Sequence, residues 1–216
     1  VIVVVAVDSS ALVEEVEQAH RAGIKVIAYD RLLLCSGADL YISFDNEMVG
    51  TLMGLTIADQ IPDGGKFIKI GGPVKDNNVK LVEQGFLKEI SGKKLDILAS
   101  FNASEWKGEE AFNYLNSHVR ELYQAGAIMC GNDCLASQAI RALSERRLAG
   151  KVIVVGQDAD LDACQRIVEG TQNMTVYKPI ERLAKQAAQC AVALAEGREP
   201  VQEEGIRLET IEDGMQ

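Results

Sequence analysis

Polar and aromatic side chains that suit hydroxyl groups follow several short apolar runs of this sequence. Carboxylates accept hydrogen bonds, Lys and Arg donate them, and Asn does both. An aromatic ring offers a flat apolar surface to C–H groups, and Trp has the largest such surface. Together these residue types predict a binding site for a neutral, polyhydroxylated molecule. The candidate binding residues are Asp30, Arg31, Asn78, Trp106, Asn132, Asp158 and Lys178.

These positions can also be explained by ordinary structural roles. Asp45, Asp76 and Asp133 stand where they could cap helices. Arg31 could form an ion pair with the adjacent Asp30, and an Asn after a strand is common in turns. Since any single residue can be explained in this way, the binding interpretation depends on the set as a whole.

Catalytic chemistry has less support than binding. Hydrolysis by Ser or Cys needs a positioned base, and the two histidines, His20 and His118, lie within expected helices. The glycines at 71–72 begin neither a dinucleotide fingerprint nor a phosphate-binding loop. Asp30 and Asp158 could serve as the acid and base of a glycosidase, but no second acid is expected beside either. The sequence therefore predicts no catalytic residue, no enzyme activity, no metal and no cofactor.

The composition excludes several other classes of protein. The 216 residues are 47% hydrophobic and 25% charged, which is typical of a globular chain and not of a disordered one. The net charge of −10 argues against nucleic acid as a partner, because phosphates are bound through Lys and Arg. The longest apolar run, Val1–Val7, is far shorter than the roughly 20 residues of a membrane-spanning helix.

The five cysteines are expected to be free, buried thiols. Their number is odd and their spacing irregular, which argues against a disulfide framework. Cys130 and Cys134 form a C-x₃-C pair, but no second pair is present to complete a zinc site.

Short β-branched runs alternate with amphipathic stretches along the whole chain. This alternation predicts parallel sheets covered by helices on both faces, with ligands at the carboxyl ends of the strands. The expected strands are Val1–Val7, Lys25–Tyr29, Tyr41–Phe44, Lys66–Ile70, Leu95–Ser100, Ala127–Met129, Val152–Gly156, Asn173–Tyr177 and Gly205–Glu209. The expected helices are Ala11–Ala22, Asn46–Gln60, Asn77–Ile90, Trp106–Tyr123, Cys134–Arg146, Asp160–Glu169 and Pro179–Glu196.

The chain resembles the periplasmic sugar-binding proteins of the ribose/galactose type, and most of all their D-xylose-binding branch. The resemblance runs across nearly the whole chain in the order of the family. The matching segments are Ala28–Arg31, Tyr41–Glu47, Asp76–Asn78, Gly131–Asp133, Gly156–Leu161 and Gly170–Ile180.

This resemblance implies an α/β protein of two doubly wound parallel-sheet lobes joined by three crossings. The first lobe would hold residues 1–44 and 179–203, and the second would hold residues 45–178 and 204–216. The β-α-β-α segment that opens the family's fold is absent from this sequence. We therefore expect that the first lobe is incomplete and that a further segment or a second chain completes it.

The resemblance also implies a function. The protein would bind a neutral monosaccharide, most readily D-xylose, between its lobes, and the seven candidate residues would contact the sugar. It would deliver the sugar to an ABC transporter permease or to a membrane sensor kinase. The expected location is outside the cytoplasm, either in the periplasm or as a membrane-tethered lipoprotein of a Gram-positive anaerobe, in which five cysteines are acceptable.

One alternative uses the same fold and the same sugar site. A LacI-type or xylose-responsive transcription regulator carries this domain in the cytoplasm, where free thiols are ordinary. It would need a DNA-binding segment outside this chain. A signal peptide or a helix-turn-helix at the start of the gene product would distinguish the two functions.

Overall fold

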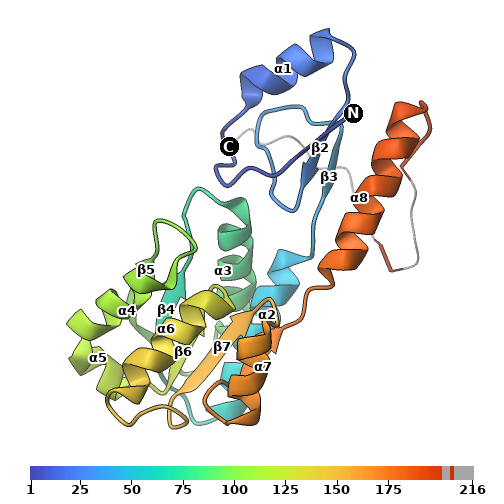
Figure 1. The fold of residues 1–216 in the computed structure, drawn as a ribbon. Helices are drawn as coiled ribbons and strands as arrows, with labels where there is room; N and C mark the ends of the chain where they lie inside the picture. The colour runs from blue at the N-terminus through green and yellow to red at the C-terminus, as the bar shows by residue number, and fades with distance from the viewer. Residues whose placement is uncertain (201–204, 207–216) are drawn as a thin grey trace. The chain divides into compact units, whose positions relative to one another are not determined.

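The structure is a computed structural model that describes residues 1–200, 205 and 206, and its contacts divide the chain into two compact units (Figure 1). Unit 1 contains residues 1–44, residues 75–78 and the described residues from 179 onward. Unit 2 contains residues 45–74 and 79–178. The boundary expected between residues 203 and 204 lies outside the described residues.

The observed division differs from the expected one at residues 75–78, which the sequence analysis assigned to the second lobe. Two ion pairs, which could not be predicted from the sequence, explain why this segment belongs to unit 1. Lys75 Nζ lies 2.8 Å from Asp8 Oδ2, and Asp76 Oδ2 lies 2.7 Å from Arg31 Nε. These contacts tie the segment to unit 1.

Unit 1 is built on a three-stranded parallel sheet in the order β1-β2-β3. Its central strand β2 is almost wholly buried, and both helices of the unit contact it. Within the described residues, strand β1 pairs with β2 alone, and both Val3 in the strand and Val5 just after it are exposed. The elements of this unit are β1 (Ile2–Val4), α1 (Val13–Arg21), β2 (Val26–Tyr29), β3 (Leu40–Ile42) and α8 (Ile180–Ala195).

Unit 2 is built on a five-stranded parallel sheet in the order β5-β4-β6-β7-β8. Because all five strands are parallel, their carboxyl ends lie at one edge of the sheet. The first two residues of α3 belong to unit 1 and the rest to unit 2. The elements are α2 (Asn46–Gln60), β4 (Gly65–Gly71), α3 (Asn77–Ile90), β5 (Leu95–Asn102), α4 (Gly108–Ser117), α5 (Val119–Gln124), β6 (Ala127–Cys130), α6 (Asp133–Ser144), β7 (Ile153–Gln157), α7 (Leu161–Val168) and β8 (Met174–Val176).

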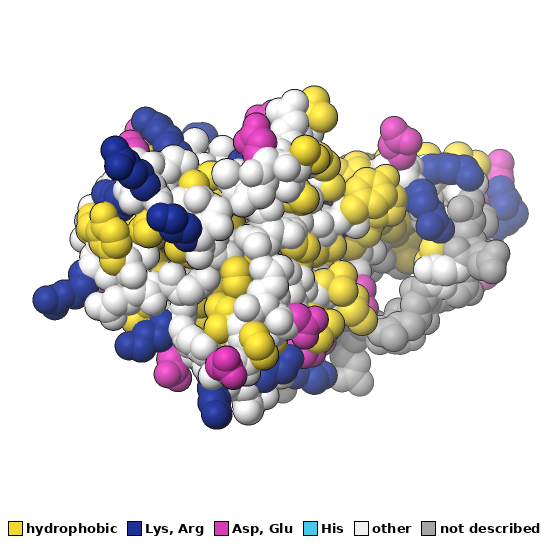
Figure 2. Space-filling view, turned by 90° about the horizontal axis from the view of Figure 1, so that it is seen from below, with side chains coloured by type: hydrophobic (Ala, Val, Ile, Leu, Met, Phe, Trp, Pro, Cys, Tyr) yellow, Lys and Arg dark blue, Asp and Glu magenta, His cyan; other side chains and the backbone are white. Residues whose placement is uncertain are grey.

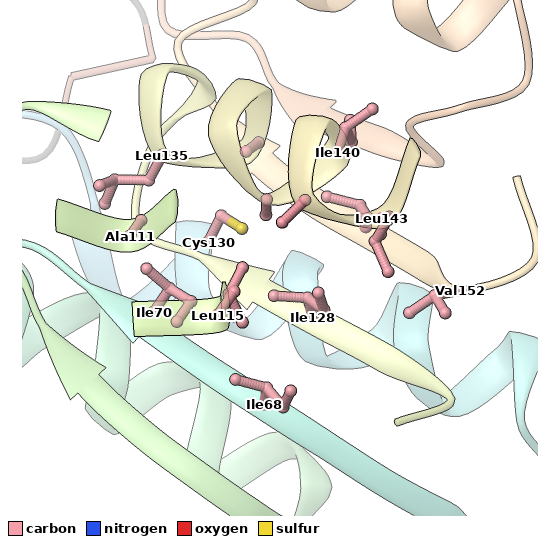
Figure 3. Packing of buried hydrophobic residues seen from close by; sticks show 14 of the residues in the cluster. Ile68, Ile70, Ala111, Leu115, Ile128, Cys130, Leu135, Ile140, Leu143 and Val152 are labelled. Atoms are coloured by element: carbon pink, nitrogen blue, oxygen red, sulfur yellow. The ribbon is translucent and has the colours of Figure 1, made fainter. Parts of the chain in front are cut away.

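Helices cover both faces of the unit 2 sheet, as expected for an α/β protein. Successive side chains of a strand point to opposite faces, so Phe67 and Ile68 of β4 belong to different cores. Phe67 packs with residues of α2 and α3, whereas Ile68 packs with residues of α4, α5 and α6. Figure 3 shows the second core, where Leu143 of α6 points toward the strand that carries Ile128.

The structure confirms the eight strands expected up to residue 177, with shifts of a few residues at their ends. Most of the ninth, Gly205–Glu209, lies outside the described residues. The single helix expected at 106–123 is wrong, because α4 ends at Ser117 and α5 begins at Val119. At the break, the Ser117 hydroxyl and the His118 ring both contact the Tyr114 carbonyl, and such side-chain bonds compete with the helix.

The described surface carries charges of both signs. On the face shown in Figure 2, Lys and Arg side chains are interspersed with acidic and apolar ones. No helix within the described residues has both the length and the apolar character that crossing a membrane requires.

Candidate functional site

The unit 1 set consists of Asp30, Arg31, Asp76 and Asn78, which three separate segments bring together. Arg31 Nε donates to Asp76 Oδ2 at 2.7 Å, and the side chain of Asp76 is completely buried. The other oxygen of Asp76 accepts from the backbone N–H of Asn78 at 3.0 Å. Asp76 therefore caps the start of α3, as the sequence suggested, and also holds Arg31 in place.

The carbonyl oxygen of Asp30 is the second meeting point of this set. It accepts hydrogen bonds from Asn78 Nδ2 at 3.1 Å and from the Ser43 hydroxyl at 2.7 Å. Asp30 itself has a φ of 63°, a left-handed conformation that is uncommon outside Gly and that Asp tolerates better than most residues. The Oδ1 atom of Asn78 is buried and has no hydrogen-bond partner among the described residues. Asn78 therefore has an acceptor that a ligand hydroxyl could satisfy.

Trp106 lies in the loop after β5, against two glycines at the carboxyl edge of the unit 2 sheet. A methyl group on Gly72 would lie 2.4 Å from Cη2 of Trp106, and one on Gly131 would lie 3.3 Å from its Cζ3. The indole can approach the backbone this closely only because both positions are glycine. Trp106 is partly buried, so part of its surface remains open to solvent.

Asn132 follows β6 and caps α6, the role that the sequence suggested for Asp133. Its Oδ1 accepts from the backbone N–H of Leu135 at 2.9 Å. Asp133 is buried instead, and its carboxylate accepts from Gln172 Nε2 and Thr175 Oγ1. Burial raises the pKa of Asp133, although these hydrogen bonds lower it in part.

Asp158 and Lys178 form an ion pair, with Oδ1 and Nζ 2.7 Å apart. Both side chains are largely but not completely buried, with 30% and 15% of their surfaces exposed. Asp158 has a φ of 105° and Ala159 a φ of 56°, which turns the chain sharply at the end of β7. The next N–H, that of Asp160, donates to Asp133 at 3.1 Å, so the buried carboxylate supports this turn.

The two histidines contact residues outside the seven candidates. His20 pairs with Asp39, and His118 stacks on Tyr114 with ring centroids 4.0 Å apart. All five cysteines lie within the described residues and none forms a disulfide there, but the expectation that they are buried is wrong for three of them. Cys130 and Cys190 are buried, whereas Cys35, Cys134 and Cys164 are exposed because they lie in a loop or on the outer faces of helices.

Lys69, Glu83 and Gln157 also lie in this region but are not among the seven candidate residues. Lys69 lies in the apolar strand β4 between Ile68 and Ile70, and only 6% of its surface is exposed. Its ammonium forms an ion pair with Glu83 of α3. A charged residue within an otherwise apolar strand is the sequence signal that could have identified Lys69.

Comparisons with known proteins give a consistent result. Residues 1–199 match the family model described as periplasmic binding protein domain. The D-xylose-binding periplasmic protein of Escherichia coli (strain K12) is 41% identical over 205 residues, which cover 93% of this chain and 62% of that protein. The protein of the same name from Haemophilus influenzae is 41% identical over 199 residues, covering 90% of this chain and 60% of its own.

A solved structure matches across almost the whole chain. A carbohydrate transporter solute binding protein from Chloroflexus aurantiacus, in complex with D-glucose, aligns with a TM-score of 0.87 at 25% identity. The match covers 99% of this chain and 72% of that one. This chain thus spans about three-fifths of the length of the two curated relatives.

Proposed function

Because this chain belongs to the periplasmic binding protein domain family, we propose that it binds a neutral monosaccharide reversibly and leaves it chemically unchanged. D-xylose is the first candidate, since two relatives that share 41% of their residues with the chain are named for binding it. The candidate residues Asp30, Arg31, Asn78, Trp106, Asn132, Asp158 and Lys178 would contact the sugar.

The observation that carries this proposal is the make-up of the unit 2 sheet edge. An indole surface, an amide and a carboxylate–ammonium pair follow strands whose carboxyl ends share that edge. Sugar hydroxyls need donors and acceptors together, and the C–H face of a sugar needs an apolar ring. The unit 1 set adds a guanidinium and a second amide, so each unit offers hydrogen-bonding groups of both kinds.

The same geometry favours binding over catalysis. His20 and His118 are both engaged away from the strand ends. The carboxylate of Asp158 already engages the ammonium of Lys178, so this pair offers hydrogen-bonding groups to a ligand.

We further propose that the protein works outside the cytoplasm and passes its sugar to an ABC transporter or a membrane sensor. The support is that relatives carry the word periplasmic in their names and that a structural relative is named for carbohydrate transport. We also propose that a lipid anchor tethers the protein to the membrane. The five cysteines support this, because they suit a Gram-positive anaerobe, in which such binding proteins would be lipoproteins.

Calorimetric titration tests the binding proposal. The longest native form of the protein that carries residues 1–216 would be titrated with D-xylose, D-glucose, D-ribose and an amino acid. We expect saturable heat with D-xylose and recovery of the unchanged sugar. Tighter binding of the amino acid, or consumption of the sugar, would contradict the proposal.

A further inference from the structure

A small cavity lies at the carboxyl edge of the unit 2 sheet, next to the Trp106 ring. Its apolar lining includes Val82 and Met129, and its polar lining consists of Lys69, Glu83 and Gln157. The space open to the centre of a water-sized molecule is about 10 Å³. That is enough for one oxygen-sized group and no more.

Gln157 brings an unsatisfied acceptor to this cavity. The residue ends β7 directly before Asp158, and only 5% of its surface is exposed. Its Nε2 donates to the carbonyl of Gly131 at 2.5 Å, which fixes the orientation of the amide. Its Oε1 is buried and has no hydrogen-bond partner within the described part of the chain. A buried amide oxygen in this state is costly, so it favours an incoming O–H or N–H donor.

Lys69 brings a donor to the same cavity. Its side chain lies on the face of β4 that packs against α3, where Glu83 balances its charge. An ammonium has three N–H donors, and a single carboxylate oxygen engages one of them. A group that donates to Gln157 and accepts from Lys69 would be suited to both, and a sugar hydroxyl is such a group.

We propose that Gln157 determines sugar specificity, its Oε1 accepting a hydrogen bond from one hydroxyl of the bound sugar while Lys69 donates to that hydroxyl's oxygen. This inference rests on the proposed sugar-binding function and adds two residues to the seven candidates. Because the cavity admits one oxygen atom, Gln157 and Lys69 together contact a single hydroxyl of the ligand.

The test combines a variant with sugar analogues. Gln157→Met keeps the length of the side chain and removes both polar atoms. The matched control is Asn102→Leu, which removes a similar amide–carbonyl bond, from Asn102 Nδ2 to Gly72 O, at the carboxyl end of β5. Asn102 is not part of the cavity lining. Both variants and the unchanged protein would be titrated with D-xylose and with analogues that each lack one hydroxyl.

We expect Gln157→Met to weaken D-xylose binding about tenfold and Asn102→Leu to change it by less than about twofold. One deoxy analogue should bind the unchanged protein about as weakly as D-xylose binds the Gln157→Met variant. The affinity of that analogue should not fall further in the Gln157→Met variant, because the missing hydroxyl and the substitution remove the same hydrogen bond. Lys69→Met should show the same dependence on the same hydroxyl.

Two results would overturn the inference while leaving the sugar-binding function intact. One is that Gln157→Met behaves like Asn102→Leu. The other is that Gln157→Met weakens every analogue by the same factor, which would indicate a retained water or a structural role. If Gln157→Met does not fold, Gln157→Glu keeps an acceptor at the same length and should keep the single-hydroxyl dependence. If the unchanged protein binds no sugar, it is the proposed function that fails.

Discussion

Asp30 and Asp158 share an unusual property, since each directly follows a strand, has a positive φ and is a binding candidate. Such a conformation costs free energy in a non-Gly residue, and it persists only where neighbouring contacts hold it. The Ser43 hydroxyl donates to the carbonyl of Asp30. Next to Asp158, the N–H of Ala159 donates to the hydroxyl of Thr175, which in turn donates to Asp133. The side chains are thus held in fixed directions before any ligand arrives.

Replacing Asp158 tests this at a single side chain. Asp158→Asn keeps the shape and the tolerance for positive φ but removes the charge that Lys178 faces. We expect sugar affinity to fall by about 2–3 kcal/mol, since a charge-assisted bond is lost and its partners stay buried. Calorimetry with D-xylose measures the change.

The control for this variant is Asp160→Ala. Asp160 occupies the N-cap position of α7 but its side chain makes no capping bond. Its replacement should leave the affinity within about twofold. Equal affinities in all three proteins would show that Asp158 only shapes the turn.

Residue types and strand-end positions were enough to nominate the candidates, but not to say what they contact. Asp76 was recognised as a cap, and its second role, holding Arg31, depends on a partner 45 positions away. Gln157 adjoins the candidate Asp158 but was not itself a candidate, because its contact with the carbonyl of Gly131 joins residues 26 positions apart. Partner choice is a tertiary property, and local sequence does not encode it.

Helices α2 and α3 pack more closely than their side chains would usually allow, because each has a glycine at the contact. A methyl group on Gly50 would lie 1.9 Å from the carbonyl oxygen of Val82, and one on Gly85 would lie 1.9 Å from that of Glu47. Neither glycine was noticed in the sequence, since an isolated glycine in a helical pattern indicates only a small loss of helix propensity.

Gly50→Ala should therefore destabilise the protein despite alanine's higher helix propensity. We expect a loss of roughly 1–3 kcal/mol in the free energy of unfolding, because the backbone of α3 must move away. Gly54→Ala on the same helix is the control. Its methyl group would lie 3.0 Å from the Cβ atom of Glu89 and 3.2 Å from the carbonyl oxygen of Phe86, so a smaller movement and a smaller loss are expected. Urea unfolding of both variants gives the comparison, and equal losses would refute the explanation.

Asp39 joins neighbouring segments of unit 1, and its contribution to the stability of the folded state should depend on pH. Its carboxylate accepts from Lys25 Nζ at 2.7 Å and from the N–H of Val26 at 2.8 Å. Burial by itself would raise the pKa of Asp39, but these hydrogen bonds lower it overall below 3.8. The ionised form thus stabilises the folded state above pH 3.8, and this contribution disappears as the pH falls through the lowered value.

Asp39→Asn should cost about 1 kcal/mol at neutral pH, after screening by solvent. The difference from the unchanged protein should shrink below pH 3.8, as measured by urea unfolding at several pH values. Glu17→Gln, which breaks an exposed pair with Arg21, should have no measurable effect at any pH. A difference for Asp39→Asn that stays constant down to pH 2 would exclude the carboxylate charge as its cause.

The strands were predictable because short apolar runs, whether alternating with polar residues or continuous, are typical of strands. All eight strands expected up to residue 177 are present. The break between α4 and α5 was not predictable from periodicity, because apolar residues continue across it. It depends on Ser117 and His118 turning to the Tyr114 carbonyl.

At the scale of the whole molecule, one edge of the unit 1 sheet, that of β1, has no partner strand among the described residues. Val1, Ile2, Val3, Val5 and Val7 are all more than two-fifths exposed along this edge. An exposed apolar edge strand is a template for pairing with another chain. We expect residues 1–216 expressed alone to self-associate.

Val3→Lys should reduce this association, because a charged side chain on an edge strand disfavours pairing. Val168→Lys is the control, since Val168 is 89% exposed but ends a helix rather than lying on a strand. Light scattering after size-exclusion chromatography, at several concentrations, measures the mass. A monomer at every concentration in the unchanged chain would show that the edge is protected.

The order in which the units become complete during synthesis follows from their places along the chain. Unit 2 comes from one nearly continuous stretch, so it can fold as soon as β8 has left the ribosome. Strands β1 to β3 are made first, but α8, which contacts β1 and β2, is made last. At ordinary elongation rates of about 5–20 residues per second, the early sheet waits on the order of ten seconds for that helix. During that interval, the surface of β1 and β2 that α8 contacts in the folded protein stays uncovered.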